Sequence, residues 1–141
     1  MVLENQGFGF RSFLKRQAGR VAGLALLMVI AFCLAAMATW NVADPSFSHA
    51  TGNEVTNAMG YPGAVFSDLA MQFFGLSAVA GLVPAVVWAL LLLTARGIGR
   101  LPRRGLAWAG FALCAAAMAG CVVPPPTWPL PIGLGGVVGD V

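Results

Sequence analysis

Three long apolar stretches, separated by charged or turn-rich segments, dominate the pattern of the chain. The first covers about residues 21–40 and contains no charged residue. The second covers about residues 67–94, and the third covers about residues 105–123. About 20 apolar residues in a helix cross a hydrocarbon core of roughly 30 Å, so each stretch is long enough for one span. The pattern predicts an all-α membrane protein with three transmembrane helices in an antiparallel helical bundle.

The basic residues form two clusters, and each cluster borders a predicted span. All 8 Lys and Arg residues belong to them. They are Arg11, Lys15, Arg16 and Arg20 in the first cluster, and Arg96, Arg100, Arg103 and Arg104 in the second. Cytoplasmic segments of membrane proteins are enriched in Lys and Arg, so both clusters are expected in the cytoplasm.

This topology divides the chain into segments on alternate sides of a bilayer. Residues 1–20 form a cytoplasmic basic segment, in which interleaved Phe and basic residues suggest a short interfacial helix. A membrane domain follows over residues 21–141, with an external loop at 41–66 and a cytoplasmic loop at 95–104. The short cytoplasmic loop makes the second and third spans antiparallel neighbours.

Composition agrees with a location in the lipid bilayer. Hydrophobic residues make up 59% of the chain and charged residues 9%, too few to cover a soluble domain of this size. The pI of about 9.1 also invites a nucleic-acid interpretation. However, the basic residues adjoin apolar spans, where they set orientation and contact anionic headgroups, rather than forming a dedicated basic face.

Turn-forming residues are dense in the predicted external loop, so no continuous helix is expected there. A short amphipathic helix is predicted over residues 53–59, and Ser67 is predicted to cap the second span with Asp68 near the positive end of its dipole. Asp44, Pro45 and Gly60 are expected to fix turns of the loop. The candidates for a partner-facing surface are Asp44, Pro45, Ser46, Gly60, Gly63 and Asp68.

Small and polar residues within spans commonly face other helices, where they permit close approach and hydrogen bonding. The helix-packing candidates are Gln72, Gly75, Ser77, Pro84, Ala112, Ala116 and Gly120. Proline is also expected to bend the second span near its middle. A proline-rich segment at residues 124–131 cannot be helical, and the glycine-rich ending after it resembles the first residues of a fourth span.

Catalytic, cofactor-binding and metal-binding residues are not indicated. Lys15 is the only lysine and Arg16 follows it, so a G-x-x-x-x-G-K-[ST] phosphate loop cannot occur in these residues. His49 is the only histidine and lies in the predicted loop, without a nucleophile or convergent ligands. The 3 cysteines lie in predicted spans without a C-x-x-C pair, which indicates neither a disulfide framework nor a zinc site.

Several short segments together resemble one known family. They are the sequence NVADPSFS at 41–48, NAMGYPGAVFSD at 57–68, the pair Phe74-Gly75, and GGVVG at 135–139. This combination is similar to the N-terminal four-span membrane domain of FtsK/SpoIIIE-type DNA translocases. The resemblance extends over roughly residues 20–141, and the chain ends before the fourth span would be complete.

The resemblance implies a function that the residues alone do not show. It implies a multi-pass anchor in the bacterial inner membrane at the division septum, with a cytoplasmic N-terminus. This anchor would belong to a cell-division DNA translocase that couples chromosome segregation to division. In the family, a C-terminal hexameric motor uses ATP and Mg and contacts DNA and Xer recombinases. The implied partners of this segment are the lipid bilayer, divisome proteins and further copies of the chain.

Two alternatives stay open on the sequence. A stand-alone small membrane protein, such as a transporter subunit, would use Gln72, Ser77 and Pro84 to line a cavity, and a natural stop codon after Val141 would favour it. A secreted protein with a cleaved leader would be processed after Ala38 and would lack its N-terminus in mass spectra.

Overall fold

The computed structural model describes residues 2–141, and it describes side chains from residue 9 onward. In this part of the chain it contains helices and no strand. The helices are α1 (Val2–Ala38), α2 (Gly60–Phe74), α3 (Ser77–Leu93), α4 (Leu101–Gly120) and α5 (Gly136–Asp140). The prediction of an all-α fold is confirmed.

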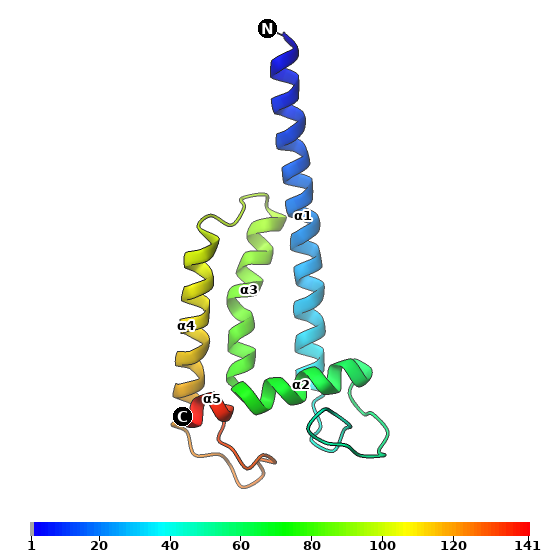
Figure 1. The fold of residues 1–141 in the computed structure, drawn as a ribbon, viewed down its shortest axis with the longest axis vertical. Coiled ribbons are helices and arrows are strands. Elements are labelled where there is room, and N and C mark those ends of the chain that lie inside the picture. The colour runs from blue at the N-terminus through cyan, green and yellow to red at the C-terminus, as the bar shows by residue number, and fades with distance from the viewer. Residues whose placement is uncertain (1) are drawn as a thin grey trace.

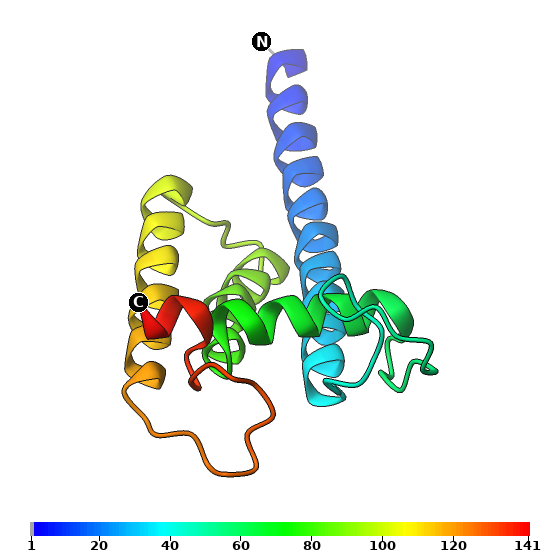
Figure 2. The same ribbon diagram turned by 60° about the horizontal axis from the view of Figure 1, so that its bottom comes forward.

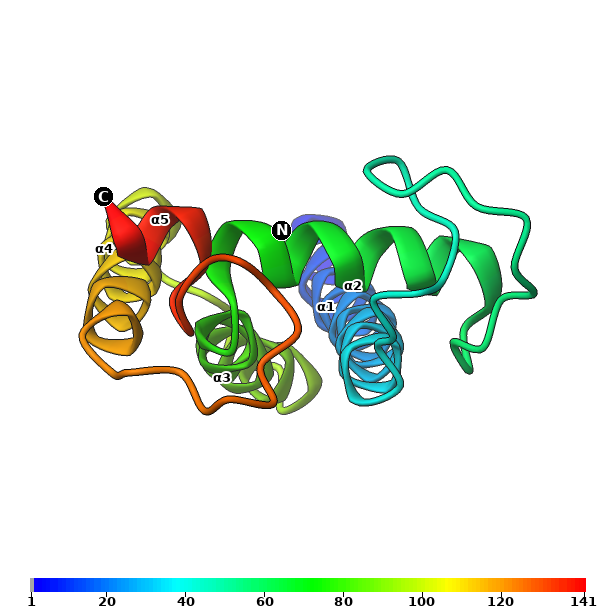
Figure 3. The same ribbon diagram turned by 90° about the horizontal axis from the view of Figure 1, so that it is seen from below.

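Three of the helices stand side by side, and α2 lies across their ends (Figure 1). Helix α3 lies between α1 and α4 and runs antiparallel to both. Helix α2 passes across one end of this row toward α5, as the view from below shows (Figure 3). We call this end, with α2, α5 and the segments 39–59 and 121–135, the loop end. The opposite end, with the α3–α4 connection, is the basic end.

The second predicted span, residues 67–94, is wrong as a single continuous helix. Helices α2 and α3 meet at a bend of 108°. Gly75 sits at the bend with φ 56° and ψ −143°, a conformation that residues with a side chain avoid. The backbone N–H of Leu76 then donates to the carbonyl oxygen of Leu134 at 2.9 Å. Helix α3 continues through Pro84, and the sharp bend of the predicted span lies at Gly75.

Residues 39–59 form the first long loop. The predicted loop 41–66 therefore ends too late. The short helix predicted at 53–59 is absent. Helix α2 already begins at Gly60 because Pro62 fits the first turn of a helix, where its missing N–H needs no partner. Ser67 and Asp68 consequently lie inside α2, and the predicted roles at a helix N-terminus are wrong for both.

The first helix is longer than the predicted span 21–40. It runs without interruption from Val2 to Ala38, so the separate interfacial helix predicted within residues 1–20 does not form. Its N-terminal part projects beyond the basic ends of α3 and α4 (Figure 1). The glycines near the N-terminus do not break it, because an isolated glycine in a helix costs only about 1 kcal/mol.

Helix α4 begins and ends earlier than the predicted span 105–123. The connection from α3 covers residues 94–100, so Arg103 and Arg104 belong to the first turn of α4 rather than to the predicted loop 95–104. Pro102 fits this first turn for the same reason that Pro62 fits α2.

One helix of the described residues is long and apolar enough by itself to cross a membrane. It is α1 over residues Gly9–Ala38, and α2 with α3 meets the same criterion only when the two are taken together. Helix α4 therefore remains a predicted span rather than one that its own length and composition establish.

Close backbone contact joins α1 to α3. A β-carbon on Gly23 would lie 2.8 Å from the carbonyl oxygen of Ala89 and 2.8 Å from the amide nitrogen of Leu93. Gly19 lies one turn earlier and faces Leu92. This G-x-x-x-G spacing is typical of helices that approach closely in membranes.

Aromatic side chains join α3 to α4. The rings of Trp88 and Trp108 lie 6.4 Å apart, centroid to centroid. The indole N–H of Trp108 donates to the carbonyl oxygen of Gly81 at 2.7 Å. This bond fixes the height of α4 against α3 near Pro84.

Gly23→Ala tests the contact between α1 and α3. The added methyl group must push the two backbones apart, so we expect the free energy of unfolding in detergent to fall by about 1–3 kcal/mol. Gly110→Ala in α4 is the matched control, since a β-carbon there meets nothing within 4 Å. Equal stability of the two variants in a denaturant titration would contradict the packing described.

Candidate functional site

The loop end carries a polar network, and Asp44 organises its first part. Asp44 is buried, with 4% of its surface exposed. Its carboxylate accepts hydrogen bonds from the backbone N–H of Thr56 at 2.9 Å, from the Thr56 hydroxyl at 2.7 Å and from the backbone N–H of Asn57 at 2.9 Å. The carboxylate therefore ties the start of the loop to its end.

Asn57 links the loop to α1 and α2. Its buried side-chain amide donates to the carbonyl oxygen of Ala36 at 2.8 Å, and it also contacts the carbonyl oxygen of Thr39 and the hydroxyl of Ser67 at 3.3 Å each. The free carbonyl groups at the C-terminus of α1 thus find a partner. Gly63 allows this arrangement, because a β-carbon there would collide with the Asn57 side chain.

Asp68 holds the middle of the loop against α2. It is buried, with 6% of its surface exposed. Its carboxylate accepts hydrogen bonds from the hydroxyls of Ser46 at 2.6 Å and of Ser48, and from the side-chain amide of Gln72 at 3.0 Å. Gln72 also donates to the Ser48 hydroxyl at 2.6 Å. All three donors are neutral, so hydrogen bonds from uncharged groups offset the desolvation free energy of burying this carboxylate.

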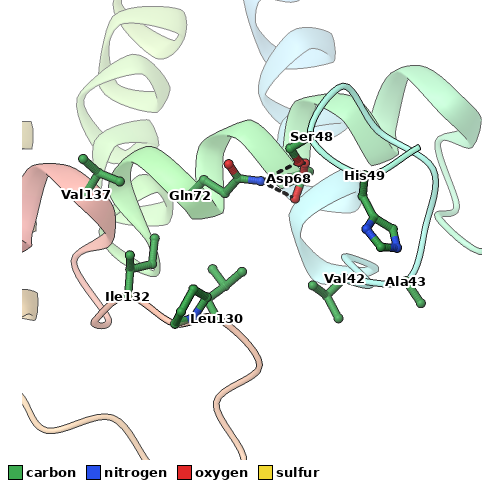
Figure 4. A pocket seen from close by; sticks show the side chains of 10 residues that line it. Val42, Ala43, Ser48, His49, Asp68, Gln72, Leu130, Ile132 and Val137 are labelled. Atoms are coloured by element: carbon green, nitrogen blue, oxygen red, sulfur yellow. Dashed lines mark hydrogen bonds between the residues drawn. The ribbon is translucent and has the colours of Figure 1, made fainter. Parts of the chain in front are cut away.

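A cavity of about 530 Å³ opens beside this cluster (Figure 4). Ser48, His49, Asp68 and Gln72 supply its polar side. Its apolar side comes from two distant segments, which contribute Val42, Ala43, Leu130, Pro131, Ile132 and Val137. The segment 128–137 and the first loop thus line the cavity together, and Figure 2 shows the two segments near opposite ends of α2.

Two tryptophans connect the two loop segments. The rings of Trp40 and Trp128 lie 6.2 Å apart, centroid to centroid. The indole N–H of Trp128 donates to the carbonyl oxygen of Ile132 at 2.8 Å, which closes a tight turn in the proline-rich segment. Trp40, which follows the end of α1, therefore packs against a tryptophan of the second loop segment.

Small residues bring α4 and α5 into backbone contact. A β-carbon on Gly135 or Gly139 would collide with the carbonyl oxygen of Ala116, and one on Gly120 would collide with that of Gly139. Ala116 is fully buried, while Ala112 is half-buried one turn earlier. Helix α5 lies roughly in line with α2 in Figure 3. The expectation that the glycine-rich ending starts a fourth span stays a prediction.

The remaining packing candidates lie apart from one another. Gln72 faces the loop-end cavity, the Ser77 hydroxyl donates to the carbonyl oxygen of Phe74 at 2.6 Å, and Pro84 lines a separate hollow beside Trp88 and Trp108. The structure does not bring Gln72, Ser77 and Pro84 to one cavity, which the transporter interpretation needs.

The other predicted loop residues surround the same network. Pro45 is half-buried between Asp44 and Ser46, and Gly60 begins α2 with φ 66°. His49 is exposed at the rim of the cavity, and its backbone N–H donates to the Ser46 hydroxyl at 3.2 Å. Among the described residues, no group of three or more His, Cys, Asp or Glu side chains is placed to hold a metal ion.

Charge is divided between the two ends of the molecule. The basic residues of α1, of the α3–α4 connection and of the first turn of α4 lie toward the basic end. The described carboxylates, Asp44, Glu54, Asp68 and Asp140, lie at the loop end. The side chain of Glu4 lies outside the described residues.

Sequence reasoning missed Ser48, Thr56 and Asn57, which complete the two carboxylate clusters. Asn57 stood in the segment predicted as a short helix, where its amide would have faced solvent. A usable signal was the pair Asp44 and Asn57 itself, since Asp and Asn commonly bond to nearby backbone groups in loops.

The fold and the loop end define a helical membrane domain with a hydrogen-bonded, carboxylate-centred loop face. The chain belongs to the family described as the 4TM region of DNA translocase FtsK/SpoIIIE, whose model matches residues 15–141. The resemblance identified from the sequence is confirmed.

Relatives of known name agree with this assignment. The chain is 66% identical over its whole length to the DNA translocase FtsK of Mesorhizobium japonicum, and it covers 16% of that protein. It is 61% identical to the DNA translocase FtsK of Brucella suis over 94% of the chain and 16% of the relative. For the DNA translocase FtsK of Agrobacterium fabrum the identity is 52%, over 95% of the chain and 15% of the relative. No solved structure matches at a significant level.

Asp44→Ala tests the loop network. The substitution removes the acceptor for two backbone N–H groups, so we expect the free energy of unfolding to fall by about 1–3 kcal/mol. Glu54→Ala is the control, because Glu54 is an exposed carboxylate in the same loop. A chemical denaturation series in detergent that shows the same small effect for both variants would contradict the organising role of Asp44.

Proposed function

We propose that the chain is the membrane-anchoring and septum-targeting domain of a cell-division DNA translocase. The observation that carries this proposal is the division of charge in a helical domain of this family. Basic residues gather at one end of the bundle and the described carboxylates at the other. By the positive-inside rule the basic end faces the cytoplasm and the loop end faces outward.

The orientation follows from the same charges. The N-terminus and the α3–α4 connection lie in the cytoplasm, and α1, α3 and α4 cross the inner membrane. Helix α2 lies along the outer surface of the membrane. Its position across the ends of the upright helices supports this placement (Figure 1).

The translocase activity belongs to the whole protein. This chain covers only about 16% of the length of its relatives. We propose that ATP, Mg, DNA and Xer recombinases are bound by parts of the protein outside these residues. Support comes from the relatives' name and from the lack of a phosphate-loop sequence in this chain. A hexameric assembly would place several copies of this domain side by side in the membrane.

The outer loop is proposed as the surface that meets divisome proteins. Phe47 is exposed over 76% of its surface. Its chain neighbours Ser46 and Ser48 hold the loop, because their hydroxyls donate to Asp68. An exposed aromatic side chain on a preorganised loop is well suited to binding, because little conformational entropy is lost on contact.

A domain exchange in living cells tests the septum-targeting function. We expect the full-length protein, fused to a fluorescent protein, to form mid-cell rings and support septation. Replacing residues 15–141 by an unrelated multi-span anchor should give uniform membrane fluorescence without rescue.

Phe47→Ser, which leaves both carboxylate clusters in place, should weaken the rings. Mid-cell rings with the unrelated anchor would contradict septum targeting by this domain, and unchanged rings with Phe47→Ser would contradict the role of the loop alone.

A further inference from the structure

A recess of about 250 Å³ lies at the basic end, between α1 and the C-terminal end of α3. Three cationic side chains line it, Lys15 and Arg16 from α1 and Arg96 from the α3–α4 connection. Gly19, Leu92, Ala95 and Gly97 form the rest of the wall. The recess therefore combines positive charge from two chain segments with an apolar floor.

These three cations have no counter-charge in the described structure. Within residues 9–141, none of the three side chains donates a hydrogen bond to another residue, and the described carboxylates lie at the opposite end. Three positive charges around one recess repel one another. A bound anion would relieve it.

The position of the recess indicates which anion is available. It lies where the basic clusters adjoin the apolar parts of α1 and α3, at the height where lipid headgroups meet hydrocarbon in the proposed orientation. Basic recesses between membrane helices on the cytoplasmic side are typical sites for anionic headgroups. Arginine adds directional hydrogen bonds to phosphate oxygens.

We propose that this recess binds the phosphodiester headgroup of an anionic phospholipid of the cytoplasmic leaflet. The acyl chains lie outside the recess, in the hydrocarbon beside α1 and α3. The lipid bridges α1 and the α3–α4 connection next to the Gly19–Gly23 contact. This inference rests on the proposed membrane orientation and adds a specific ligand to it.

A second basic hollow on the same end differs in construction. Arg100, Arg103 and Arg104 line it with Gly99 and Ala107, all from one continuous segment. No second helix contributes a wall, so this hollow lacks the two-sided enclosure of the first. The same three arginines offer a matched control, because removing them changes the net charge by the same amount.

The test compares two triple variants of the chain in detergent by native mass spectrometry with added lipid. The recess variant is Lys15→Gln/Arg16→Gln/Arg96→Gln, and the control is Arg100→Gln/Arg103→Gln/Arg104→Gln. The probes are phosphatidylglycerol, cardiolipin and the zwitterionic phosphatidylcholine. We expect the apparent Kd for the two anionic lipids to rise about tenfold or more in the recess variant and less than about threefold in the control. Binding of phosphatidylcholine should be weak and equal in all three proteins.

Equal losses in both triple variants would overturn the proposal, because they would show diffuse attraction to the whole basic end. A short DNA duplex that displaces the lipid from the wild type, and binds the recess variant much less, would assign the recess to nucleic acid instead. If the recess variant loses its helical circular dichroism, the single variants Arg96→Gln and Arg104→Gln replace the triple variants. The apparent Kd for anionic lipid should then rise more in Arg96→Gln than in Arg104→Gln.

Membrane fractionation of cells separates this inference from the proposed function. A chain that pellets with membranes but shows no preference for anionic lipid would contradict the recess alone. A chain that stays in the soluble fraction would contradict the membrane anchor itself.

Discussion

The turn of the chain at Gly75 is the constraint on which the rest of the loop end depends. Gly75 adopts a backbone conformation reserved for glycine, and a β-carbon there would collide with the carbonyl oxygen of Leu134. That carbonyl oxygen accepts a hydrogen bond from the backbone N–H of Leu76, and the Ser77 hydroxyl donates one to the carbonyl oxygen of Phe74. Backbone groups that the broken helix leaves open are thereby satisfied, which apolar surroundings require. The bend is therefore built into the chain and cannot straighten without losing these contacts.

The bend determines what the polar residues of α2 can do. In a straight span, Asp68 and Gln72 would enter the bilayer, where an unpaired carboxylate is expensive. With α2 lying across the helix ends, both face the first loop and bond to Ser48, and Asp68 also accepts from Ser46. The same placement brings α2 beside α5 and lets the segment 128–137 close the cavity. One glycine thus links the upright helices to the hydrogen-bonded loop end.

The sequence was sufficient for the all-α class, the basic end and the family, because apolar length and the clustering of Lys and Arg are properties of the chain itself. It was insufficient for the bend. Residues 67–94 form one apolar run, and the partner that requires glycine at position 75 is Leu134, far away in the chain. Likewise Pro62 and Gly63 signalled a loop, although proline fits a first helical turn and Gly63 makes room for Asn57. Proline and glycine correctly indicated breaks in the helices. The position of a break was predicted wrongly where a contact with a residue distant in the chain determines it.

Depth measurements on α2 test the transverse helix most directly. Spin labels would be placed at Tyr61 and Phe73, both exposed, in a background without Cys33, Cys114 and Cys121. Electron paramagnetic resonance with oxygen and nickel relaxants then gives the depth of each label in a bilayer. If α2 lies along the surface, the two labels report the same shallow depth. A straight continuation of α2 and α3 through residues 60–93 across the bilayer would instead place Phe73 deeper than Tyr61 by about 18 Å, and that result would contradict the account.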